Sequence, residues 1–111
     1  MNWKTYTEDI NIPIHWVDVS YGNDSLPSYI SGDDNHESYH IWIDSHDSEE
    51  RRINAEDTYG ITDHLPPRFH VVLCYGHDEI LFMSDDFDDV IQWIAEHPKT
   101  PDQIERTSLY I

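Results

Sequence analysis

The sequence predicts an α+β fold: a small, mainly antiparallel sheet of about four strands with one amphipathic helix, residues 84–97, packed on one face. One observation behind this prediction is an apolar alternation over 68–75 that returns, after a short turn, at 80–83. Another is a set of apolar residues spaced three and four apart, as on one face of a helix: Phe87, Val90, Ile91 and Ile94. Hydrophobic residues make up 38% of the 111 residues. This is enough for one modest core, so we expect a single domain over residues 1–111.

Four stretches are expected to form the strands. Apolar and polar residues alternate from 10 to 21 with one shift of phase, which predicts a long strand with a bulge, and Pro13 favours a sheet edge. Residues 39–44 predict the second strand. The stretch 68–75 is apolar on both faces, which predicts a central strand. Residues 80–83 are expected to return beside it after a hairpin.

A polar loop and a short helix are expected between these strands. The loop covers residues 22–35, which are rich in Gly, Asp, Asn and Ser. Asp47 is followed three residues later by Glu50, the pattern of a capping box. This pattern predicts a short helix near residues 48–55.

The main helix has a clear start and end in the sequence. Ser84 is expected to be its N-cap, and His97-Pro98 is expected to stop it. The helix macrodipole favours negative charge in the first turn, and four acidic residues occupy that turn: Asp85, Asp86, Asp88 and Asp89.

The charge balance is the most unusual property of the chain. It has 23 Asp and Glu against 6 Lys and Arg, a formal net charge of −17. The acidic residues are spread along the chain instead of forming one acidic tail. Self-repulsion at this charge destabilises a compact state. The balance disfavours direct binding to nucleic acid or an anionic membrane, and it favours a basic protein or a metal cation as partner.

Cysteine content and the absence of targeting signals suggest the cytoplasm. Cys74 is the only cysteine, so no disulfide can form within the chain, and its apolar surroundings predict a buried thiol. The N-terminus lacks the apolar stretch of a signal peptide. No apolar run approaches the length of a membrane span.

One stretch has the spacing of a zinc site. His36 and His40 with Glu37 match H-E-x-x-H, and His46 stands where the third zinc ligand of metzincins lies. However, the residues around His40 favour a strand, and on a strand His36 and His40 would lie about 13 Å apart, too far to share one ion. We therefore expect no cofactor. A small zinc-dependent hydrolase using these four residues is the alternative.

The dispersed acidity predicts a non-enzymatic inhibitor. Each strand of DNA carries a charge about every 3.4 Å along the axis, and carboxylates two residues apart on a β-strand lie about 6.6 Å apart. Such a surface suits the cleft of a basic, nucleic-acid-handling protein. Two settings fit: an immunity protein against a nuclease toxin, and a phage or mobile-element DNA mimic that acts in anti-defence by blocking a defence enzyme. An acidic surface adapted to high salt is a third explanation, which the low alanine content disfavours.

Two acidic patches and one aromatic residue are the candidate partner-binding residues. Trp42 is expected to be an exposed anchor, because it faces away from Ile41 and Ile43. The first patch is at the hairpin and helix start and contains Asp78, Glu79, Asp85, Asp86, Asp88 and Asp89. The second patch contains Asp33, Asp34, Glu37, Asp44 and Asp47.

Overall fold

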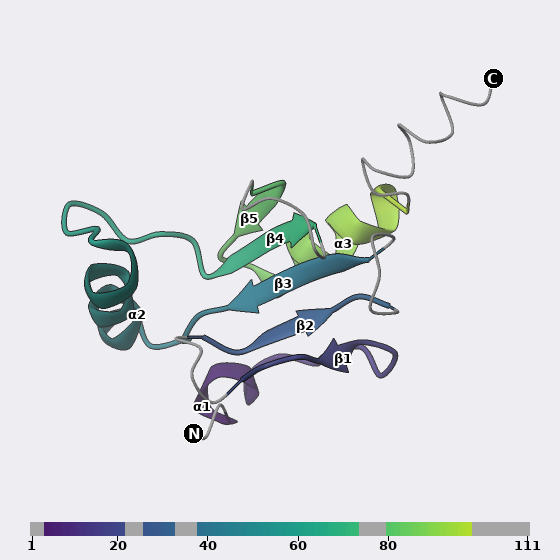
Figure 1. The fold of residues 1–111 in the computed structure, drawn as a ribbon, viewed down its shortest axis with the longest axis horizontal. Coiled ribbons are helices and arrows are strands. Elements are labelled where there is room, and N and C mark those ends of the chain that lie inside the picture. The colour runs from purple at the N-terminus through teal and green to yellow at the C-terminus, as the bar shows by residue number, and fades with distance from the viewer. Residues whose placement is uncertain (1–3, 22–25, 33–37, 74–79, 99–111) are drawn as a thin grey trace.

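An antiparallel sheet with one long helix on one face forms the centre of the molecule (Figure 1). The computed structural model describes residues 4–21, 26–32, 38–73 and 80–98. The elements in chain order are α1 (Lys4–Thr7), β1 (Val17–Asp18), β2 (Ser28–Ile30), β3 (Tyr39–Ile43), α2 (Ser48–Asn54), the π-helix η1 (Ala55–Tyr59), β4 (Phe69–Leu73), β5 (Phe82–Ser84) and α3 (Phe87–Glu96). The strands follow one another across the sheet in the order β1-β2-β3-β4-β5, and every pair is antiparallel. The predicted α+β class is confirmed, with five strands where about four were expected.

The central strands β3 and β4 carry the most buried face of the sheet. Ile41 lies opposite Val71 and Ile43 lies opposite Phe69, and all four side chains are fully buried. Since successive strand residues point to opposite faces, Trp42 points to the other face, where it is half-buried. The strands expected at residues 39–44 and 68–75 are therefore confirmed over Tyr39–Ile43 and Phe69–Leu73, and residues 74 and 75 lie outside the described residues.

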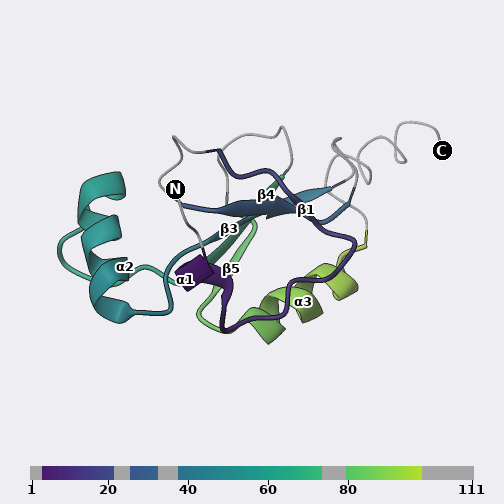
Figure 2. The same ribbon diagram turned by 90° about the horizontal axis from the view of Figure 1, so that it is seen from below.

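Aromatic contacts join α3 to this buried face, and α3 lies along one side of the sheet (Figure 2). The Phe87 ring lies 5.3 Å from the ring of Phe69 and 5.7 Å from the ring of Trp16. Further along the helix, Trp93 stacks on Phe82 with ring centroids 5.5 Å apart. Aromatic pairs of this kind each contribute about 0.5–1.5 kcal/mol beyond the area that they bury.

The N-terminal segment differs from the prediction, because residues 10–16 form no strand. Ile10 and Ile12 pack against the core instead, and a turn is closed by a hydrogen bond from the Trp16 N–H to the Pro13 carbonyl at 3.0 Å. Pro13 has no N–H to donate to a strand ladder. The strand is thereby reduced to β1, and the short helix α1 precedes it without having been predicted.

The strand that the sequence did not predict is β2, which lies within residues 22–35, where a loop was expected throughout. Tyr29 pairs with Ile41 of β3, and Ile30 is buried. The strand has only three residues, which is too short for an alternation of apolar and polar residues to show in the sequence. Pairing with the edge of β3 determines this strand.

The short helix predicted near residues 48–55 is present as α2. The Asp47 side chain accepts hydrogen bonds from the backbone N–H groups of Glu49 at 2.9 Å and Glu50 at 3.4 Å, so the predicted N-cap is confirmed. The helical path continues through η1 and ends at Gly60, whose φ of 66° is left-handed. A residue with a Cβ is strained in that conformation. In the part of the chain that the structure describes, no helix is long and apolar enough to cross a membrane.

The N-cap of α3 is Asp86 and not Ser84, which corrects the expected start of this helix. Ser84 is the last residue of β5. Asp86 has an extended backbone, and its carboxylate accepts a hydrogen bond from the Asp88 N–H at 2.9 Å. The Ser84 hydroxyl accepts a hydrogen bond from the Asp86 N–H at 3.0 Å. Ser84 therefore helps to position Asp86 as the N-cap. The helix ends at Glu96, before His97-Pro98 as predicted.

Replacing Asp86 tests this assignment. Asp86→Ala removes the acceptor of the Asp88 N–H, and we expect it to lower the free energy of unfolding by about 1 kcal/mol. Asp86→Asn keeps an acceptor oxygen and should lower it by much less. Urea unfolding at neutral pH measures both changes. Equal losses in the two variants would show that the charge, and not the cap, stabilises the start of α3.

Candidate functional site

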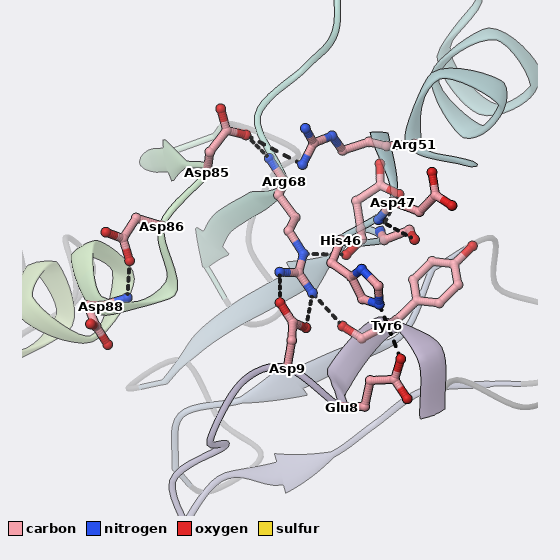
Figure 3. Close-up of polar contacts among 12 residues, drawn as sticks. Tyr6, Glu8, Asp9, His46, Asp47, Arg51, Arg68, Asp85, Asp86 and Asp88 are labelled. Carbon is pink, nitrogen blue, oxygen red and sulfur yellow. Dashed lines mark hydrogen bonds and ion pairs between the residues drawn. The ribbon is translucent and has the colours of Figure 1, made fainter. Parts of the chain in front are cut away.

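Arg68, the residue before β4, is the centre of a buried polar cluster (Figure 3). Its side chain is only 6% exposed. The guanidinium donates two hydrogen bonds to the carboxylate of Asp9, at 2.6 and 2.7 Å. It also donates to the backbone carbonyls of Tyr6 at 2.8 Å and Asp44 at 2.9 Å. One side chain therefore joins the N-terminal segment to the end of β3.

The electrostatics of this pair favour the ionised form of Asp9. The hydrogen bonds from Arg68 hold the pKa of the Asp9 carboxyl below its usual range, against the smaller opposing effect of partial burial. A two-pronged contact between guanidinium and carboxylate also fixes the orientation of both groups. Asp9 is thereby held in place although its side chain is 39% exposed.

Asp85 is held to the same cluster. Its Oδ1 accepts a hydrogen bond from the backbone N–H of Arg68 at 2.9 Å. The same oxygen lies 3.7 Å from Nη1 of Arg51, a residue of α2 (Figure 3). The start of α3 is thus tied to both β4 and α2.

A hollow of about 590 Å³ opens beside this cluster, at the N-terminal end of α3. Three aspartates of the first predicted patch line it together: Asp85, Asp86 and Asp88. Asp9 adds a fourth carboxylate from the N-terminal segment. The complete lining is Asp9, Ile10, Asn11, Arg68, Asp85, Asp86, Phe87, Asp88 and Ile91. We call this the acidic hollow. Its four carboxylates favour a cationic group.

Asp89, the remaining described residue of the first patch, is not among the residues that line the hollow. It is exposed in the first turn of α3, where its Oδ2 accepts a hydrogen bond from the Ser84 hydroxyl at 2.9 Å. Asp78 and Glu79 lie outside the described residues.

The second patch is not supported as a set, because Asp44 is only 3% exposed. Its Oδ1 accepts hydrogen bonds from the side-chain amide of Asn54 at 2.9 Å and from the Ser45 N–H at 2.7 Å. Burial raises the pKa of its carboxyl. Asp44 therefore attaches α2 to β3 and is not a surface contact. Residues 33–37, which include Asp33, Asp34 and Glu37, lie outside the described residues.

Two further predicted contact residues have different environments. Asp47 is exposed but serves as the N-cap of α2. Trp42 is half-buried, where an exposed anchor was expected, and its ring lies 4.6 Å from the ring of His40. His40 and Trp42 lie on the sheet face opposite α3, because their neighbours Ile41 and Ile43 belong to the core.

The residues of the possible zinc site are not brought together in the described structure. His40 is part of β3, whereas H-E-x-x-H binds zinc from a helix. The His46 ring lies 3.2 Å from the carboxylate of Glu8, both being exposed. Within residues 4–21, 26–32, 38–73 and 80–98, no three His, Cys, Asp or Glu residues are grouped to hold a metal ion. His36, Glu37 and Cys74 lie outside these ranges.

Most of the described acidic side chains face solvent. Among the described Asp and Glu residues, only Asp44 is buried and only Glu50 is half-buried. All three described arginines are paired with carboxylates: Arg51 with Asp85, Arg52 with Glu49, and Arg68 with Asp9. The negative surface is therefore left largely uncompensated.

Asp9 and Arg68 were missed as site residues in the sequence. They are 59 positions apart, and no periodicity connects them. The available signal was weak: a single arginine at the start of the most apolar strand, in a chain with few cations. A buried arginine needs a carboxylate partner, but the sequence does not say which of the many it is.

Comparison with known proteins adds no family to this description. No protein-family model matches the chain, and no curated protein or solved structure matches it.

Arg68→Met tests the buried ion pair. The variant keeps an apolar stem but leaves Asp9 and two carbonyls without their donor, and we expect a loss of about 3 kcal/mol in the free energy of unfolding at pH 7. The lowered pKa of Asp9 means that its stabilisation is complete above about pH 4 and is lost as pH falls through the folded-state value. The difference between wild type and variant should shrink below pH 4. A constant difference from pH 7 to pH 2 would contradict the ion pair.

Asp44→Asn tests the cost of the buried carboxylate. The raised pKa means that the charged form is disfavoured in the folded state, so wild-type stability falls as pH rises above about 4. The variant keeps an acceptor for Asn54 and the Ser45 N–H, and we expect it to be more stable by about 1 kcal/mol at pH 7 and equal to wild type near pH 3. Thermal unfolding across this range measures it. A variant that is less stable at pH 7 would show that the charge is needed, through Arg51 or His70, which favour the ionised form.

Proposed function

We propose that the protein is a non-enzymatic acidic inhibitor that binds a basic, nucleic-acid-handling protein in the cytoplasm. The observation that carries the proposal is the exposed and uncompensated negative charge, with a formal total of −17. Self-repulsion at this level costs stability, so a surface of this kind needs a functional reason. An immunity protein against a nuclease toxin and a DNA mimic that blocks a defence enzyme both fit this chemistry.

The fixed carboxylates around the acidic hollow support this proposal. Asp9 is oriented by Arg68, Asp85 by the Arg68 N–H, and Asp86 by the Asp88 N–H. Each of these carboxylates is held by the protein at one or both oxygens before any partner arrives. Groups that are ordered in advance lose little conformational entropy on binding. In this respect they are similar to the phosphates of a stiff duplex.

Inhibition would follow from occupancy of the partner's cleft. The lysines and arginines that contact phosphates in such a cleft would contact these carboxylates instead, one inhibitor to one partner. Complementary charge also speeds association, by a factor that falls steeply with ionic strength. No reacting group of the inhibitor is required.

The test is affinity capture from the organism that encodes the chain. The immobilised protein is washed at rising salt, and the retained proteins are identified. We expect a basic nucleic-acid-binding protein that survives moderate salt and elutes at high salt. Recovery of no such protein would contradict the proposal.

A triple variant then tests whether the acidic hollow is the contact surface. Asp85→Asn, Asp86→Asn and Asp88→Asn together keep the amide oxygens that cap α3 but remove three charges. A matched control with the same net charge removes three exposed carboxylates elsewhere: Asp18→Asn, Asp63→Asn and Glu96→Gln. Surface plasmon resonance with the captured protein should show an association rate roughly tenfold lower for the hollow variant and a smaller change for the control. Equal changes would show that only total charge matters.

A further inference from the structure

The helical arm formed by α2 and η1, Ser48–Asn54 and Ala55–Tyr59, lies beyond one end of the sheet (Figures 1 and 2). None of the seven residues of α2 is buried, and in η1 only Ala55 is. A surface helix usually turns an apolar stripe toward the core. This arm does not, so its attachment and its exposed apolar residues need separate explanations.

Polar contacts attach the arm to the rest of the fold. The Asn54 amide donates to Asp44 at 2.9 Å and to the Tyr6 hydroxyl at 3.0 Å. The Ser45 hydroxyl donates to Glu50 at 3.2 Å. The inner side of the arm is therefore held by hydrogen bonds, by the buried Ala55 and by a ring contact between Tyr59 and His70 at 6.3 Å.

Ile53 is the exposed apolar residue at the centre of the arm, with 51% of its surface open to solvent. Residues three and four positions away are its neighbours on a helix surface. Glu49, one turn before Ile53, is exposed and is paired with Arg52, and two positions of the following η1 turn carry the exposed carboxylates Glu56 and Asp57. An apolar side chain contributes most to binding when the partner buries it and the surrounding contacts exclude water.

We propose that the arm is a second contact surface for the same basic partner, with Ile53 entering an apolar pocket that is rimmed by Lys or Arg. This inference rests on the proposed function. Charge complementarity selects the occupant, because the carboxylates around Ile53 favour a basic rim. A second copy of this chain is disfavoured, since it would bring another surface of net charge −17 against them.

The arm is also continuous with the acidic hollow. Arg51 of α2 lies 3.7 Å from the carboxylate of Asp85, which lines the hollow. Ile53 is two positions from Arg51 and lies on a different side of α2, so a partner that fills the hollow has to extend around the arm to cover Ile53. The hollow would supply fixed charge and the arm would supply apolar contact, which improves specificity over charge alone.

Two nine-residue peptides with equal numbers of lysines test this inference: (Lys-Lys-Leu)3 and (Lys-Lys-Gly)3. We expect the purified protein to bind the leucine peptide roughly tenfold more tightly in isothermal titration calorimetry, since only that peptide can cover Ile53. In NMR spectra, the amides of residues 49–59 should shift more with the leucine peptide. Ile53→Gln should remove most of the tenfold preference. Ile14→Gln, at a fully exposed isoleucine outside the arm, should leave it unchanged.

The outcomes separate the two proposals. Binding of both peptides with equal affinity, or a preference that survives Ile53→Gln, would overturn the role of the arm and leave the acidic inhibitor intact. If neither peptide binds at low salt, the result would contradict the acidic inhibitor itself. Loss of the preference in both variants would show nonspecific apolar binding and would also overturn the role of the arm.

Discussion

The buried guanidinium of Arg68 is the interaction on which the arrangement of the site depends. It reaches the N-terminal segment through Asp9 and Tyr6, and the end of β3 through the Asp44 carbonyl. Its own backbone N–H holds Asp85 at the start of α3. Segments that are far apart in the chain therefore meet at one cation. Without it, Asp9 would lose both its orientation and its nearest positive charge.

Among the residues that the structure describes, the acidic side chains either make hydrogen bonds within the fold or face water, which limits the cost of their repulsion. Asp47 and Asp86 satisfy the free N–H groups at the starts of α2 and α3, where the helix dipole favours a negative charge. Aromatic packing of Trp16, Phe69 and Phe87 offsets part of the repulsion. The protein thus combines a small aromatic core with an almost uncompensated acidic surface.

Local patterns in the sequence predicted the elements that local chemistry determines. Strand alternation placed β3 and β4, and helical spacing placed α3. Long-range contacts were not predictable: Asp44 follows an apolar strand as a surface residue would, and only Asn54 and the Ser45 N–H explain its burial. The N-cap is Asp86 and not the predicted Ser84, because both residue types cap helices well and Ser84 belongs to β5. The Arg68–Asp9 pair had no sequence signal beyond composition.

Competition with nucleic acid tests the central claim most directly. The basic protein recovered by affinity capture is first bound to a fluorescent 20-base-pair duplex. The acidic inhibitor is then added, and the fluorescence anisotropy of the duplex is followed. We predict that the duplex is released when about one inhibitor has been added per basic protein. We also predict that no complex contains the duplex and the inhibitor together. A stable complex holding the duplex and this protein together would contradict it, since the acidic surface would then lie outside the nucleic-acid cleft.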